Sequence, residues 1–194
     1  TLSNAQCEFG YRDSIFKHVL KNKAVITTVH LALPKEWQPV LSYGPLQQLA
    51  AVTPQAVFEQ VIATRNSKLP NPYTLPNAGS FFKNPIITNQ CLATLLTTFA
   101  DLPHYKHGAK HHKVAAGWLI EQAGLKGHRI AGIEVHKQQA LVLVNYGQSQ
   151  GSDLIAMIKH IQHSVFSRYN IMLEHEVRLI NNNSECHITA EPTP

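Results

Sequence analysis

The order of helix and strand signals along the second half of the chain is the feature that most constrains its fold. A helix at 114–123 precedes strands at 130–135 and 140–145. A long helix at 152–170 and a last strand at 171–180 complete the series, and the connections between these elements are short. This order favours a compact α+β domain of mixed strands and helices.

The first half of the chain predicts two strands before any helix. Residues 24–33 and 38–43 are rich in β-branched side chains, and a turn at 34–36 separates them. Thr53 followed by Pro54 then predicts a helix start, because the hydroxyl can cap the helix and proline suits the first helical position. Apolar residues continue that helix as a stripe at Val57, Phe58, Val61 and Ile62.

A proline-rich loop at 69–76 follows this helix, and Thr88 is expected to cap a further helix that runs through 99. Between them lies the run Asn-Ala-Gly-Ser-Phe-Phe-Lys-Asn-Pro at 77–85. Gly79 permits a close backbone approach to a ligand, and Ser80 follows it directly. Local chemistry alone favours a turn that leads into an edge strand, with a ligand site as the alternative.

Composition limits the class of protein. With 194 residues and 44% hydrophobic content, the chain can bury a sizeable core as one large or two small domains. Three widely spaced cysteines predict a reducing compartment, the cytoplasm. No apolar stretch reaches the ~20 residues of a membrane span, and no charged-then-apolar leader precedes the fold. The net charge of +5 is scattered, which suits anionic ligands such as nucleotides better than nucleic acid.

Five motifs, in order, carry a family resemblance. They are Phe-Gly-Tyr-Arg-Asp-Ser at 9–14, the serine run at 77–85, Ala-Ala-Gly-Trp-Leu-Ile-Glu at 115–121, His-Lys-Gln-Gln-Ala-Leu-Val at 136–142 and Leu-Glu-His-Glu-Val-Arg at 173–178. The chain thereby resembles the UDP-N-acetylenolpyruvoylglucosamine reductases over residues 7–180. These are NADPH-dependent flavoprotein oxidoreductases of peptidoglycan biosynthesis, which form UDP-N-acetylmuramate from UDP-N-acetylglucosamine enolpyruvate.

The resemblance implies three catalytic residues. Arg12 would hold the substrate carboxylate, since a guanidinium is a fixed, charged fork that matches it. Ser80 would donate the proton to the reduced carbon, and Glu176 would lie at the same carboxylate as Arg12. Side chains alternate along a strand, so periodicity does not choose between Glu174 and Glu176; the family motif favours Glu176. Without the motif, Arg12 would be read as a surface ion-pair partner.

The resemblance also implies residues that bind the nucleotide-sugar. Their side chains offer a positive charge, paired amide groups or an aromatic ring. The expected substrate-binding residues are Tyr11, Tyr43, Lys68, Asn84, Tyr105 and Gln139. For Lys68 a helix C-terminus is the alternative explanation, because it attracts lysine through its dipole.

The chain departs from the family in its glycines. Only ten are present and none forms a phosphate-binding cluster, so we expect FAD to be bound mainly by a missing N-terminal half. The expected organisation is a C-terminal remnant of the flavin-binding domain at 1–35, a substrate-binding domain at 36–180 and a polar tail at 181–194. The isolated fragment is expected to be inactive.

Two other functions compete with this reductase hypothesis. One is a non-catalytic domain that binds nucleotides or other anions. The other is a metal-binding module, suggested by six histidines in two groups: His104, His107, His111 and His112, and then His160 and His163. Zinc sites usually add cysteine or carboxylate ligands and no Cys-x-x-Cys occurs, so we expect no metal.

Overall fold

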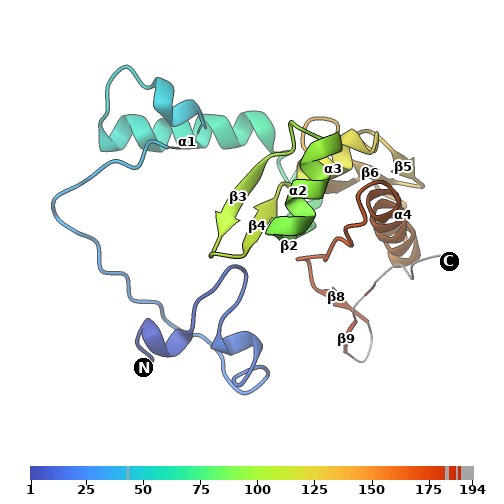
Figure 1. Cartoon of the computed structure of the whole chain (residues 1–194). Coiled ribbons are helices and arrows are strands. Elements are labelled where there is room, and N and C mark those ends of the chain that lie inside the picture. Colours follow the sequence, from blue (N-terminus) through green and yellow to red (C-terminus); the bar gives the residue numbers. More distant parts are fainter. Residues whose placement is uncertain (43, 182–183, 187, 189–194) are drawn as a thin grey trace. The chain divides into compact units, whose positions relative to one another are not determined.

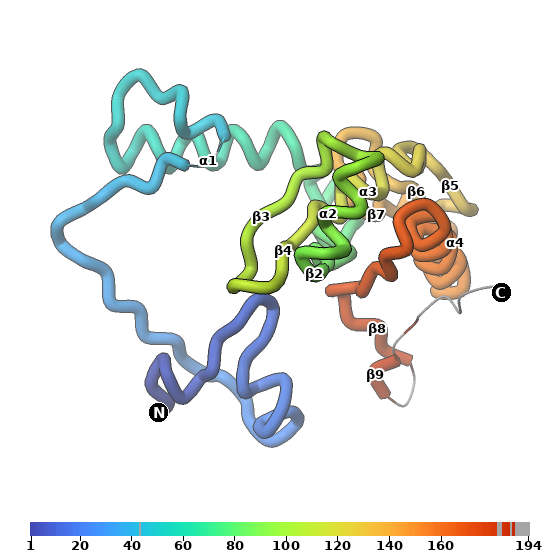
Figure 2. The backbone as a smooth tube through the Cα atoms, in the orientation of Figure 1, coloured from blue at the N-terminus to red at the C-terminus, as the bar shows by residue number. Residues whose placement is uncertain are grey.

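The computed structural model describes residues 1–42, 44–181, 184–186 and 188. The chain divides into two compact units, Thr1–Val40 and Leu41–Pro194. Figures 1 and 2 trace the backbone of each unit from the N-terminus onward. Within the described residues, no helix combines the length and the apolar character that a membrane span requires.

The N-terminal unit contains little regular structure. Its helical elements are the short 3-10 turns η1 (Ala5–Cys7) and η2 (Ile15–Lys17). The strands expected at 24–33 and 38–43 are not formed in the described residues, so that prediction was wrong for this chain. Strands persist only when neighbouring strands satisfy their backbone groups, and five large apolar residues of 24–33 instead lie exposed: Val25, Ile26, Val29, Leu31 and Leu33.

The described residues of the second unit form four α-helices: α1 (Pro54–Lys68), α2 (Asn89–Thr98), α3 (Ala116–Gln122) and α4 (Gly151–Tyr169). A 3-10 helix, η3 (Gly44–Gln48), precedes them. The predicted caps are confirmed, because Thr53 Oγ1 accepts the Ala56 N–H at 3.1 Å and Thr88 Oγ1 accepts the Cys91 N–H at 3.2 Å. The predicted stripe on α1 contributes no buried residue, and Phe58 is 60% exposed.

The strands of the second unit pair antiparallel throughout. The first sheet has the order β1-β7-β6-β5, with β1 Asn77–Ser80, β5 Arg129–Ile130, β6 Ile133–Val135 and β7 Val142–Asn145. The second has the order β2-β4-β3, with β2 Ile86–Thr88, β3 His104–His107 and β4 His111–Val114. A third pair joins β8 (Leu179–Ile180) to β9 (Glu185–Cys186). The α+β class is confirmed.

Three strand predictions differ from the structure. The single strand expected at 130–135 is a tight hairpin, β5-β6, that turns through Ala131 and Gly132. The strand expected at 171–180 is reduced to one bridge between Phe82 and His175, followed by β8. Conversely, no strand was predicted for the histidine-rich stretch, and it forms the hairpin β3-β4. Gly108, at a φ of +70°, lies in the connection between these two strands.

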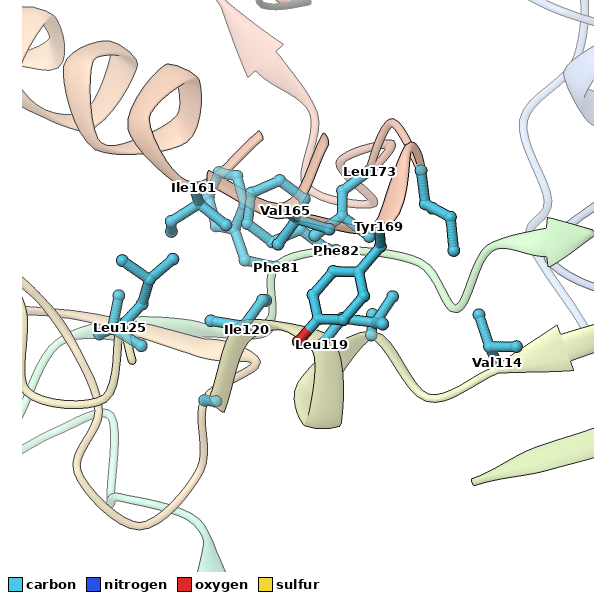
Figure 3. Close-up of a cluster of buried hydrophobic side chains, with 14 of the residues drawn as sticks. Phe81, Phe82, Val114, Leu119, Ile120, Leu125, Ile161, Val165, Tyr169 and Leu173 are labelled. Atoms are coloured by element: carbon cyan, nitrogen blue, oxygen red, sulfur yellow. The ribbon is translucent and has the colours of Figure 1, made fainter. Parts of the chain in front are cut away.

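The hydrophobic core lies between α3, α4 and the strands that flank them. Figure 3 shows its centre, where side chains from several segments meet: Phe81, Phe82, Leu119, Ile120, Ile161, Val165, Tyr169 and Leu173. Phe81 and Phe82 are 3% and 2% exposed, and their rings meet edge to face at 5.3 Å. The aromatic pair of the serine run therefore anchors the residue before it, Ser80, to the rigid core.

Candidate functional site

Ser80 is presented by a bulged strand end. Gly79 has a φ of +72°, and its N–H donates to Asn77 Oδ1 at 3.0 Å, which closes a local turn. The register of β1 with β7 shifts between Asn77 and Ser80, and bulges of this kind re-aim the side chains that follow. Ser80 is exposed, whereas the next residue, Phe81, is buried.

Phe81 joins the segment that carries Glu176 to the first sheet. Its N–H donates to the Leu141 carbonyl at 2.7 Å, and its carbonyl accepts the Glu176 N–H at 2.8 Å. The backbone of Glu176 is therefore hydrogen-bonded to the residue that follows Ser80. The structure thus places the backbones of these two predicted catalytic residues in neighbouring segments, although they stand far apart in the sequence.

Glu174, the other candidate carboxylate, has a structural partner. Its side chain forms an ion pair with Lys83, with Nζ and Oε1 at 2.5 Å, and it remains 70% exposed. The backbones of the same two residues are also paired, since the Lys83 N–H donates to the Glu174 carbonyl at 2.9 Å. Glu176 is half-buried. The two carboxylates therefore differ in exposure, a difference that strand periodicity does not predict.

Asn84 has a clear role in the fold. Its Oδ1 accepts the N–H of Ala116 at 3.0 Å, at the first residue of α3. The N-cap residue of α3 is Ala115, whose side chain makes no capping hydrogen bond. Asn84 therefore accepts from one of the N–H groups that have no partner within the helix at its N-terminus. Asn84 thus fixes the start of α3 against the serine run.

A pocket of about 250 Å³ gathers two of the predicted substrate-binding residues, Lys68 and Gln139. Its lining consists of Leu46, Val61, Thr64, Arg65, Lys68, Leu69 and Gln139. Arg65 and Lys68 lie one turn apart on α1, so both charges reach the same opening. Arg65 was not among the predicted residues, although its position three residues before Lys68 on a predicted helix was a usable signal.

Gln139 links this pocket to the serine. It precedes β7, and Val142 of β7 lies opposite Ser80 in the sheet. Its own backbone is fixed, since the Gln139 N–H donates to Nδ1 of His136 at 3.2 Å. One short, hydrogen-bonded stretch of chain therefore connects the pocket residue Gln139 with the strand that pairs with Ser80.

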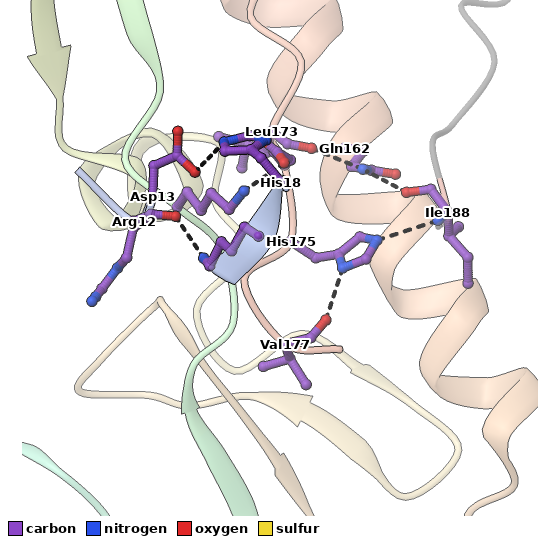
Figure 4. A network of polar contacts seen from close by, with 11 residues as sticks. Arg12, Asp13, His18, Gln162, Leu173, His175, Val177 and Ile188 are labelled. Atoms are coloured by element: carbon purple, nitrogen blue, oxygen red, sulfur yellow. Dashed lines mark hydrogen bonds and ion pairs between the residues drawn. The ribbon is translucent and has the colours of Figure 1, made fainter. Parts of the chain in front are cut away.

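Arg12 and Tyr11 form the tip of a turn in the N-terminal unit. Gly10 and Asp13 close the turn with backbone hydrogen bonds of 2.9 and 3.4 Å. Arg12 is exposed at a φ of +56°, and its guanidinium carbon lies 5.9 Å from the centroid of the Tyr11 ring. The hydrogen bond from His18, at 2.7 Å, holds the pKa of Asp13 below its usual range (Figure 4).

Tyr105 and Tyr43 are the remaining predicted substrate-binding residues. Tyr105 lies on β3 and is 60% exposed. Tyr43 lies outside the described residues. The histidine-rich hairpin is held by its own contacts: the rings of His104 and His112 meet edge to face at 5.7 Å, and Nδ1 of His112 lies 3.1 Å from Oδ1 of Asn89. In the part of the chain that the structure describes, no three metal-ligating side chains converge.

Comparison with protein families places this site in a known context. Residues 71–180 match the family model described as UDP-N-acetylenolpyruvoylglucosamine reductase, C-terminal domain. The match begins just after the last residues of α1 and covers the serine run, the Gln139 stretch and the Glu176 segment.

Individual relatives match over a longer stretch. A UDP-N-acetylenolpyruvoylglucosamine reductase of Pseudoalteromonas translucida is 97% identical over all 194 residues, which make up 58% of its length. The enzyme of that name in Aliivibrio fischeri is 48% identical over 97% of this chain and 54% of its own length. One from Escherichia coli is 47% identical over 95% of this chain and 54% of its own. The chain spans little more than half the length of these relatives.

Proposed function

The chain belongs to the UDP-N-acetylenolpyruvoylglucosamine reductase family, and from that premise we propose that it forms the substrate-binding part of a flavin-dependent enzyme. The enzyme uses NADPH to reduce UDP-N-acetylglucosamine enolpyruvate to UDP-N-acetylmuramate in peptidoglycan biosynthesis, in the cytoplasm. The observation that carries the proposal is the backbone of Phe81, the residue after Ser80, which is hydrogen-bonded both to Glu176 and to Leu141, two residues after the pocket residue Gln139.

Each catalytic side chain has a chemical task. Reduction of the enolpyruvyl double bond leaves a carbanion-like carbon beside a carboxylate, and that carbon must receive a proton. The exposed hydroxyl of Ser80, anchored by its buried neighbour, is suited to donate it. Arg12 neutralises the charge of the substrate carboxylate, and Glu176 lies beside that carboxylate and can share a proton with it.

The pocket on α1 suits the diphosphate of the nucleotide-sugar. Lys68 supplies a compact positive charge there, and the amide of Gln139 supplies both a donor and an acceptor. NADPH carries the same diphosphate, so the two compounds compete for these groups. Asn84, Tyr11, Tyr43 and Tyr105 complete the proposed substrate-binding set.

The flavin is assigned to the remainder of the protein. FAD, when bound, supplies the hydride acceptor and donor that serine, arginine and glutamate lack. In the described residues the six glycines with positive φ are scattered from Gly44 to Gly147, with no glycine-rich phosphate loop among them. The glycines of the described residues therefore do not fit the flavin diphosphate.

The first residues of the chain are proposed to belong to that flavin-binding part. Several apolar side chains of residues 24–33 are exposed to solvent, among them Val25 at 87% and Leu33 at 81%. A strand of this composition gains stability only when neighbouring strands cover it. We assign 1–35 to the flavin-binding domain, 36–180 to the substrate-binding domain and 181–194 to a polar tail.

Substitution of Ser80 by alanine in the full-length, flavin-loaded enzyme tests the proposal. Reduction of the flavin by NADPH should survive, because that half-reaction protonates no substrate carbon. Reoxidation by the enolpyruvyl substrate should slow by roughly 10²–10⁴, the usual loss with a positioned general acid. Stopped-flow absorbance of the flavin measures both halves.

Equal slowing of the two half-reactions, or a loss of less than a few-fold in the second, would reject Ser80 as the donor. A full-length protein that binds UDP-sugars but does not oxidise NADPH would favour the competing function, an anion-binding domain. The pair of cations on α1 is the observation that supports this second candidate.

A further inference from the structure

Two buried polar side chains hold the segment that carries Glu176. Gln162 of α4 is fully buried, and its Nε2 donates to the carbonyls of Leu173 at 2.8 Å and Ile188 at 3.3 Å. His175 is 8% exposed and contacts the carbonyl of Val177 and the N–H of Ile188. Figure 4 shows these four contacts as one connected group.

The contacts of His175 fix which ring nitrogen carries the proton. Nε2 lies 3.2 Å from the Ile188 amide nitrogen, which is a donor, so Nε2 must accept. Nδ1 lies 2.8 Å from the Val177 carbonyl, which is an acceptor, so Nδ1 must donate. Both contacts are satisfied together only by the neutral imidazole with its proton on Nδ1.

The hydrogen bond from His175 Nδ1 to the Val177 carbonyl forms a closed loop that contains Glu176. It runs from residue 175 to residue 177, so the backbone of Glu176 lies inside the closed loop. On the other side, the Glu176 N–H is held by the Phe81 carbonyl and the backbone of His175 is paired with Phe82. With Leu173 held by Gln162, the chain is tied on each side of Glu176.

We propose that His175 is a positioning residue for Glu176. Its Nδ1–H holds the Val177 carbonyl and so sets the direction in which the Glu176 carboxylate leaves the backbone, while Ile188 selects the tautomer. His175 touches neither substrate nor cofactor in this role. The proposal rests on the function assigned above to Glu176, and displacing a catalytic group by about 1 Å can cost on the order of 10²-fold in rate.

Two amide substitutions separate the contacts of His175. In His175→Asn the side-chain NH₂ lies near the position of Nδ1 and keeps the donor to Val177. In His175→Gln the amide reaches the position of Nε2 and keeps the acceptor for Ile188 but loses the donor to Val177. The two variants differ by one methylene group, and His111→Gln, at an exposed position on β4, is the control for histidine loss.

The full-length, flavin-loaded enzyme provides the kinetic readout. His175→Gln should slow flavin reoxidation by the enolpyruvyl substrate roughly 10- to 100-fold. Its rate of reduction by NADPH should stay unchanged, because that half-reaction does not use Glu176. His175→Asn should stay within a few-fold of wild type throughout, as should His111→Gln. Equal rates for the Asn and Gln variants would overturn the proposal.

Nitrogen-15 NMR of the imidazole in the unsubstituted full-length protein gives a readout that is independent of activity and of variant folding. The expected spectrum is that of a neutral ring protonated on Nδ1, and a ring protonated on Nε2 would overturn the proposal. If the unsubstituted enzyme shows no reductase turnover, the assigned function fails. Normal turnover with an unaffected His175→Gln variant rejects the positioning role alone.

Discussion

At the scale of single residues, side chains of similar chemistry have different surroundings and different roles. Glu174 pairs with Lys83 at the surface, whereas Glu176 is half-buried beside the serine segment. The amide of Asn84 supports a helix start, and that of Gln139 lines a pocket. Residue type alone therefore predicts a range of roles, and the hydrogen-bond partner selects one of them.

Lys68→Ala tests the pocket on α1. Loss of one charged hydrogen bond to a diphosphate costs about 1.5–3 kcal/mol, so the affinity of the full-length enzyme for UDP-N-acetylglucosamine enolpyruvate should fall roughly 10- to 100-fold. Isothermal calorimetry measures it. Lys110→Ala, at an exposed position between β3 and β4, is the matched control and should bind as wild type does. Unchanged affinity in Lys68→Ala would remove this lysine from the site.

Asn84→Ala should lower the free energy of unfolding. It leaves the buried Ala116 N–H without its acceptor, which costs about 1–3 kcal/mol. Asn84→Asp keeps an oxygen at the same position and should recover most of that loss. Urea unfolding followed by circular dichroism measures both variants. If alanine and aspartate destabilise equally, the contact with α3 is not what Asn84 contributes.

At the scale of elements, α4 organises the second unit. Its buried face packs in the core through Met157, Ile158, Ile161 and Val165, and the polar Gln162 on that face holds the Glu176 segment. A second polar contact lies toward β5, where the rings of His160 and His128 stack at 4.4 Å. Burial, followed by the charges of His128 and His163, lowers the pKa of His160.

This shift predicts how stability changes with pH. The folded-state pKa of His160 lies below its unfolded value, so the unfolded chain takes up the proton first as the pH falls through about 6.5. The free energy of unfolding should therefore decrease below that pH. His160→Gln should lessen the decrease, and His111→Gln should not. Urea titrations at pH 7.5 and 5.5 provide the comparison, and parallel losses in all three proteins would contradict it.

At the scale of the whole molecule, the two units differ in how well they bury their apolar residues. The second unit encloses a continuous core, whereas several apolar residues of the first remain exposed, including Val29, Leu31 and Trp37. The relatives are almost twice as long as this chain. Covering strands from the remaining part of such a protein would account for the composition of 24–33.

We predict that the 194-residue chain alone purifies without flavin. Its positive-φ glycines are dispersed along the described residues, so they form no glycine-rich loop for a diphosphate. Flavins absorb between roughly 350 and 500 nm. The isolated chain should show no absorbance there, and the full-length protein should show a flavin spectrum. A stoichiometric yellow colour in the isolated chain would contradict the assignment of the cofactor site.

Local signals in the sequence determined much of this structure. Thr53 and Thr88 marked helix starts because capping depends on a hydroxyl and the amides of the next turn, all within four residues. The α+β class followed from the order of such signals, and the family resemblance followed from motifs that a linear reading detects. Arg65 was within reach too, since helical spacing places it beside Lys68.

Contacts between distant segments were decided only by the tertiary structure. The strand predicted at 24–33 fails in this chain because its backbone needs partners that local sequence does not supply. The meeting of Phe81 with Glu176, the capping of α3 by Asn84 and the closure of His175 around Glu176 depend on register and side-chain direction. Such pairings arise from the packing of the whole core, so no short window of residues encodes them.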